Sequence, residues 1–278
     1  MIKTKKLVEE KEGFLLAPDP ERVMEGLRDT GYNFNTAIAD IIIDLNPRNE
    51  VNVYISDNGT GMDEDGLKNA MRYGSKKRDD PSSLGKFGLG LKTSSTAFCR
   101  CLSVISRGTG DNNVRKVQWD LDYIAQTKEW NLKLPSVTED EIDILDATTN
   151  GGTGTLVVWE KIDRLLKTYN NKNSAKNALK KTINALHFHT SMVYQRFLDL
   201  NDSRAKNIKI TLNGSEVEAW DPFCLTEKDT EKLSDEIIDV EMPDGKTSMF
   251  TIRAYMLPRR ENFSTSQARD KARLSNDM

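Results

Sequence analysis

Cysteine and histidine are scarce in this chain, and their scarcity excludes two kinds of small-protein architecture. The 278 residues include only three cysteines (Cys99, Cys101 and Cys224) and two histidines (His187 and His189). Three thiols do not make a disulfide framework, and neither residue type shows the paired spacing of a zinc site. The cysteines suit core packing in a reducing compartment, and we therefore expect a cytoplasmic protein.

The chain also lacks long apolar runs and a dominant charge. No stretch approaches the roughly 18 apolar residues of a membrane span, and the start MIKTKKLVEEKEG has no apolar signal region. The formal net charge of −3 gives no global attraction to nucleic acid. The stretches SKKR and KNALKK are locally basic, but solvated faces explain them better than a nucleic-acid contact does.

Apolar patterning predicts a mixed α/β domain over residues 1–200 and a smaller β-rich domain over 201–278. Alternation predicts strands in RCLSVISRG, VRKVQWDLDYI, EWNLKL and GTLVVWEKI. Helical spacing predicts a long amphipathic helix, broken once, in SAKNALKKTINALHFHTSMVYQRFLD. The Asn213-Gly214 pair predicts a hairpin in NIKITLNGSEVEAW.

Residues 35–56 combine a helix signal and a strand signal without a connector. NTAIADI favours a helix over 35–41, whereas IIIDL opens a hairpin over 42–56. This helix would have about two turns and would leave no residues for the usual helix-to-strand connection. We therefore infer that a segment is absent after Ile41, either unobserved or deleted. The expected sign is a gap between Ile41 and Ile42 wider than the roughly 3.8 Å of bonded Cα atoms.

Three glycine-containing turns carry the chemistry. ISDNGTGMD places Asp57 at a strand end before Gly59 and Gly61, where a carboxylate can accept a hydrogen bond from an exocyclic amine. GKFGLGLKTSS, residues 85–95, presents backbone N–H groups and a helix N-terminus, for which phosphate is the natural ligand. NGGTGTLVVW places Thr155 and two glycines before a buried strand. Each turn taken alone is also compatible with a plain structural role.

The glycine-rich stretch matches neither of two better-known phosphate loops. The P-loop requires Lys directly after its last glycine, whereas Leu91 separates Gly90 from Lys92. Gly85, Gly88 and Gly90 read G-x-x-G-x-G, which is not the dinucleotide fingerprint G-x-G-x-x-G.

The order of the motifs resembles the ATP-binding domain of the GHKL (Bergerat-fold) ATPases, which include DNA gyrase, the large heat-shock chaperone, sensor histidine kinases and MutL. That order is D-x-G-x-G-M, a charged loop, G-x-x-G-x-G-x-K and G-T-G-T before a strand, over about residues 30–165. The chain is most similar to the microrchidia (MORC) type and its bacterial relatives. The resemblance implies an α+β fold, a two-layer α/β sandwich of the Bergerat type, followed by a partial β-rich transducer-like domain.

The resemblance also implies a role for each motif residue. Asp57 would bind the adenine amino group, helped through water by Gly61 and Thr155. Gly59 would also belong to the cofactor-binding residues, and Met62 would line the adenine pocket. A lid over ATP would lie at about residues 63–84. The residues that wrap the phosphates would be Gly85, Lys86, Phe87, Gly88, Leu89, Gly90, Leu91 and Lys92.

In the family's first motif, a helix carries an acid that activates water and, one turn later, an Asn that binds magnesium. AIAD puts Asp40 in the place of the acid, where it is shorter than the usual Glu. The Asn is absent from the chain, and Asp44 would be the metal ligand only if the chain is unbroken. Lys271 could correspond to the lysine that contacts the terminal phosphate, but a surface charge is the better interpretation.

These implications predict a magnesium-dependent ATPase with ATP and Mg²⁺ as cofactors and slow hydrolysis. Lid closure and homodimerisation would make it a conformational switch that acts on DNA or a protein client, without a membrane. Two alternatives stay open: a non-hydrolysing nucleotide sensor or scaffold, and a histidine kinase catalytic domain. The long region after residue 200 and the lack of a preceding phospho-acceptor helix disfavour the kinase.

Overall fold

A computed structural model describes residues 38–46, 48–74, 89–110, 113–166, 169, 171–202 and 206–272. The chain divides into a compact unit that extends to Glu218 and a second unit that starts at Ala219. This division lies later than the boundary predicted near residue 200. The hairpin at Asn213-Gly214 belongs to the first unit, and its strands β6 and β7 extend the sheet of that unit.

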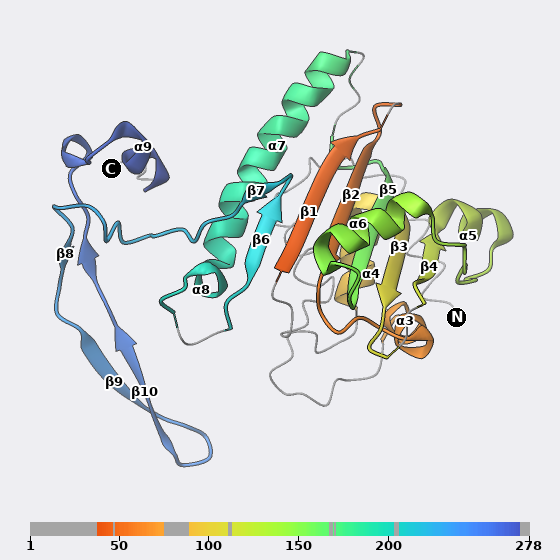
Figure 1. Ribbon diagram of the computed structural model, residues 1–278. Coiled ribbons are helices and arrows are strands. Elements are labelled where there is room, and N and C mark those ends of the chain that lie inside the picture. Colours follow the sequence, from red (N-terminus) through yellow and green to blue (C-terminus); the bar gives the residue numbers. More distant parts are fainter. Residues whose placement is uncertain are drawn as a thin grey trace. The chain divides into compact units, whose positions relative to one another are not determined.

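The first unit is built on a seven-stranded sheet with the order β4-β3-β5-β2-β1-β6-β7 (Figure 1). Neighbouring strands are antiparallel, except that β1 and β6 are parallel. The strands are β1 (Ile38–Leu45), β2 (Val51–Asp57), β3 (Cys99–Arg107), β4 (Arg115–Asp120), β5 (Gly154–Ile162), β6 (Lys209–Leu212) and β7 (Ser215–Glu216).

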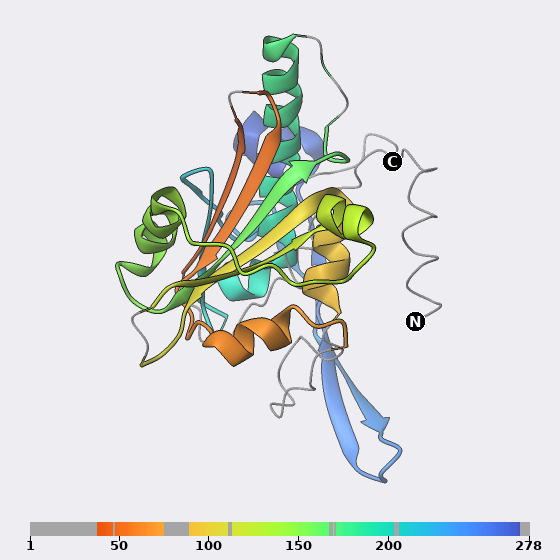
Figure 2. The same cartoon turned by 90° about the vertical axis from the view of Figure 1, so that its right-hand side faces the viewer.

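Helices cover the two faces of this sheet unequally (Figure 2). The larger core packs one face against α3 (Glu64–Ala70), α4 (Gly90–Phe98), α5 (Leu121–Thr127) and α7 (Lys172–Val193). A smaller core packs α6 (Glu139–Thr149) against the other face. The predicted α/β sandwich of the Bergerat type is confirmed.

Strand β1 occupies the segment for which the sequence predicts a helix and a chain break. Ile41 faces Ile55 of β2 and Ile42 faces Tyr54, so the two isoleucines are consecutive residues of one unbroken strand. The predicted helix is wrong for residues 38–41, and 35–37 lie outside the described residues. The strand is favoured because it pairs with β2 on one side and β6 on the other. These long-range contacts outweigh a local helix propensity of a few tenths of a kcal/mol per residue.

Most other elements lie where the pattern predicts them. The long helix is broken at Tyr194, between α7 and α8 (Gln195–Leu198). EWNLKL forms only one isolated bridge to β4 instead of a strand. The second unit holds β8 (Glu231–Lys232), β9 (Glu236–Glu241), β10 (Thr247–Ile252), β11 (Tyr255–Met256), the 3₁₀ turn η2 (Arg260–Asn262) and α9 (Ser266–Lys271). Within the described part of the chain, no helix has the length and apolar character needed to cross a membrane.

Candidate nucleotide site

Three polar side chains lie in one row across the ends of β2, β5 and β3. Asp57 is paired with Thr155, and Thr155 is paired with Ser106. Because side chains alternate along a strand, this row shares a face with Ile55 and Val157, which belong to the larger core. Thr155 and Ser106 are buried, and Asp57 is half-buried. The row therefore lies on the sheet face that α3, α4 and α7 cover.

The hydrogen bonds of Ser106 determine what Thr155 can offer a ligand. Ser106 Oγ donates its single proton to the Gly154 carbonyl at 2.8 Å and accepts the Met62 N–H at 2.8 Å. Thr155 Oγ1 lies 3.0 Å from the same oxygen, so the Thr155 hydroxyl must be the donor of that bond. Thr155 Oγ1 is then left with acceptor lone pairs only. It suits a donor such as a water molecule or an amine.

The turn that follows Asp57 is held at several points. One carboxylate oxygen of Asp57 accepts the Gly59 N–H at 2.8 Å, which fixes the orientation of the carboxylate. Thr153 Oγ1 donates to the Gly59 carbonyl at 2.8 Å and so ties the turn to the start of β5. Because Met62 N–H is bound by Ser106, the turn contacts both β5 and β3.

Two of the motif glycines are required by packing. Gly61 has φ +63°, and a Cβ there would lie 1.9 Å from the Arg107 carbonyl oxygen. A Cβ on Gly154 would lie 2.1 Å from the Asp57 carbonyl oxygen. The sequence interpretation assigns Gly61 to the nucleotide site and Gly154 to the turn before a buried strand, whereas in the structure other backbone segments approach both glycines too closely for any side chain.

The predicted phosphate loop is described only at its helical end. Gly85, Lys86, Phe87 and Gly88 lie outside the described residues, whereas α4 begins at Gly90 after an N-cap Leu89 that offers no capping side chain. Lys92 is only 2% exposed, and its Nζ donates to the Ala70 carbonyl at 2.9 Å. Burial lowers the pKa of the Lys92 ammonium to about 8.

The predicted lid at about 63–84 begins with a packed helix. Asp63 caps α3, and both Leu67 and Met71 are fully buried in the larger core. A lid that included these two side chains would open that core when it moved, and the lid stays a prediction. Residues 75–84 lie outside the described residues.

The structure does not bring Asp40 to the Asp57 row. Asp40 is paired with Ser56, whereas its neighbour Ala39 is paired with Asp57. The Asp40 side chain therefore projects from the opposite face of the sheet, where its carboxylate accepts a hydrogen bond from Thr211 Oγ1. The chain is unbroken, which meets the condition stated for Asp44, but Asp44 is an exposed strand residue on the same sheet face as Asp40, so it does not lie beside the Asp57 row.

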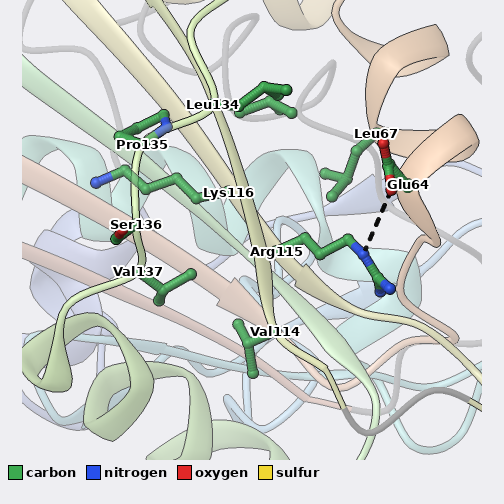
Figure 3. Close-up of a pocket in the computed structure, with 10 residues that line it drawn as sticks. Glu64, Leu67, Val114, Arg115, Lys116, Leu134, Pro135, Ser136 and Val137 are labelled. Carbon is green, nitrogen blue, oxygen red and sulfur yellow. Dashed lines mark ion pairs between the residues drawn. The ribbon is translucent and has the colours of Figure 1, made fainter.

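An open pocket of about 320 Å³ lies between α3 and β4, and its lining includes Arg115, the cross-strand partner of Ser106 (Figure 3). Lys133 exchanges two backbone hydrogen bonds with Gln118, and continuing that ladder would put Pro135 opposite Lys116. Proline has no N–H to donate, so the ladder ends and the pocket opens there. The walls combine apolar groups with the loose Glu64–Arg115 ion pair, 3.9 Å long. No residue of the predicted nucleotide site lines this pocket.

The fold is of the Bergerat type, and the motifs follow the order found in the GHKL class of ATPases. Residues 30–155 match the profile of the histidine kinase-, DNA gyrase B- and HSP90-like ATPases, so this segment is a GHKL-type ATPase domain. It contains Asp57, Gly61 and Thr155. A search of curated proteins finds no match.

Among solved structures, the ATPase and transducer domains of DNA topoisomerase II from Balamuthia mandrillaris align with a TM-score of 0.42 and 12% identity. The alignment covers 72% of this chain and 47% of that one, so this chain spans about half of the solved protein's length. The similarity to the MORC type stays a prediction.

Proposed function

We propose that the first unit binds ATP at the Asp57 row, hydrolyses it slowly and uses it as a conformational switch. The observation that carries this proposal is the row itself, which lies inside the segment that matches the ATPase family. The Asp57 carboxylate accepts a hydrogen bond from the adenine amino group. Thr155 accepts a hydrogen bond from a water molecule beside the adenine. Met62, anchored through its N–H to Ser106, packs against the base.

The phosphates would lie at the start of α4. The first N–H groups of a helix favour an anion, and Leu89 provides no side chain that competes for them. Lys92, in the first turn, is buried and donates to the Ala70 carbonyl, so its ammonium group would have to leave that contact to reach a phosphate. Magnesium dependence stays a prediction, since no group of three potential metal-ligating side chains occurs among the described residues.

The proposal is tested by titrating the full chain with a non-hydrolysable ATP analogue in a calorimeter and measuring the mass of the complex by sedimentation. We expect saturable binding, with GTP at least tenfold weaker, and a doubling of mass if nucleotide drives homodimerisation. Absence of measurable ATP binding at millimolar concentration would contradict the site, and binding without a mass change would contradict only the switch by dimerisation.

A second candidate function is a nucleotide sensor or scaffold that does not hydrolyse ATP. The position of Asp40 favours it, because the residue predicted to be the general base is bound to Thr211 on the other face of the sheet. A base must lie within hydrogen-bond reach of the attacking water, directly or through one further water.

Asp40→Ala separates the two candidates. We expect the variant to release phosphate within about twofold of the wild-type rate, because general-base catalysis contributes about 10²–10⁴-fold only where the base reaches its proton, and equal rates at the background level without protein would favour the sensor. Phosphate release is measured in single-turnover assays, with Asp44→Ala on the same strand as a matched control. A hundredfold loss confined to Asp40→Ala would restore Asp40 as the base and contradict the sensor.

A further inference from the structure

One stretch of the chain carries charge of a single sign. Between Asp163 and Asp199 there is no acidic residue, whereas seven lysines and arginines occur, in a chain whose net charge is −3. Most of this stretch is α7, the long helix on the larger-core side of the sheet (Figure 1). Four of these seven positive charges are therefore presented on one helix.

Three lysines of this helix, Lys172, Lys176 and Lys180, form a row that we call the α7 lysine face, and Lys181 lies about 100° further round the helix from Lys180. All four are exposed, whereas Leu179 on the same helix is buried in the core. The first three recur every four residues, so consecutive members lie along one row with a rise of about 6 Å.

The lysines of the α7 lysine face have no counter-charge among the residues that the structure describes, and neither has Lys181. Several other exposed lysines have an acidic partner, although Lys128, Lys206 and Lys228 have none within the described part of the chain. Elsewhere the pairing is local: Lys209 lies 2.8 Å from Glu216, and Lys246 lies 3.1 Å from Asp244. An unpaired row of ammonium groups leaves a positive potential that attracts a polyanion.

We propose that the α7 lysine face binds the phosphodiester backbone of a nucleic-acid duplex without reading its sequence. Lysine acts as a point charge toward phosphate, and the exposed amides of Asn173, Asn177 and Asn184 can donate hydrogen bonds to phosphate oxygens. A membrane surface is disfavoured, because α7 exposes no large apolar side chain before Met192 among the described residues and an interfacial helix needs such anchors. The surface lies outside the Asp57 row, so the proposal does not depend on ATP binding.

The test uses the full chain, no nucleotide, and fluorescence anisotropy with a labelled 20-base-pair duplex of DNA or of RNA. One triple variant, the α7 variant, replaces Lys172, Lys176 and Lys180 with Gln. The control triple variant replaces Lys209, Lys232 and Lys246 with Gln, and each of these three lysines has an acidic partner. Both variants lose the same net charge. Glutamine and lysine have similar helix propensities, so α7 should stay folded, and the unfolding midpoint checks this.

For the α7 variant, we expect the slope of log affinity against log salt to become shallower by about 3 units and the low-salt affinity to fall at least about tenfold. The control should keep the wild-type slope. DNA and RNA duplexes should behave alike, because both present the same phosphodiester charge. Equal losses in the two variants, or wild-type binding without salt dependence, would overturn the proposal. Equal or tighter binding of polyglutamate or of phosphatidylserine vesicles at this face would overturn it in favour of a protein or a membrane partner.

Discussion

Asp57→Asn is expected to weaken ATP binding by about 100-fold while leaving the fold intact. The amide oxygen can still accept the Gly59 N–H, so the turn keeps its shape. The other end of the side chain becomes an NH₂ donor that faces the adenine amino group, which is also a donor. Loss of a hydrogen bond to a charged group costs about 1.5–3 kcal/mol, or about 10- to 150-fold in affinity. The measurement is calorimetric titration with the ATP analogue.

The same variant gives a second, qualitative readout. Guanine presents a carbonyl oxygen where adenine presents its amino group, so Asp57→Asn should narrow or reverse the preference for ATP over GTP. Asp44→Asn, at an exposed position of β1, is the matched control and should change neither affinity. Unchanged ATP affinity in Asp57→Asn would remove Asp57 from the site.

The parts of the site that the sequence predicts are those with local signals. A strand that ends in Asp57 and glycines, a helix over 64–70 and a helix after Gly90 can each be read within about ten residues. That these segments meet in one site is inferred from the order of the motifs along the chain, which resembles that of a known family. What the sequence does not reveal is the reason for the glycines, because the groups that crowd Gly61 and Gly154 lie on other strands.

The incorrect predictions concern residues whose environment is determined far away in the chain. Asp40 lies in a strand because β1 pairs with β6, where its partner is Thr211. No window of sequence around Asp40 contains that information. Local propensity then favours a helix, and long-range pairing overrides it.

Ser106 is the site residue that the sequence interpretation misses. A signal for it is present, since it is the second serine of a largely apolar strand, two residues after Val104 and directly before Arg107. A buried hydroxyl at the end of a strand needs partners, and Ser106 finds them in Met62 and Gly154. The identity of those partners requires the sheet order, which places β3 next to β5.

Gly61→Ala is expected to cost more than about 4 kcal/mol of unfolding free energy, or to abolish folding of the first unit. A residue other than glycine at φ +63° costs about 1–2 kcal/mol by itself, and the added Cβ would lie 1.9 Å from the Arg107 carbonyl oxygen. That carbonyl cannot withdraw easily, because the Arg107 side chain binds Asp146 at 2.7 Å and the Gly152 carbonyl at 2.9 Å. The loss is a large fraction of the 5–15 kcal/mol typical of a folded domain.

Gly214→Ala separates backbone strain from the clash. Gly214 has φ +76° in the hairpin after β6, but a Cβ there would meet no atom within 4 Å. Gly214→Ala should therefore lower the free energy of unfolding by only about 1–2 kcal/mol, the cost of a left-handed backbone conformation alone. Urea unfolding of both variants measures the difference, which is the energy of the contact between the Asp57 turn and β3. If the two substitutions cost the same, the turn is not pressed against Arg107, and the row of Asp57, Thr155 and Ser106 loses the packing that would hold it together.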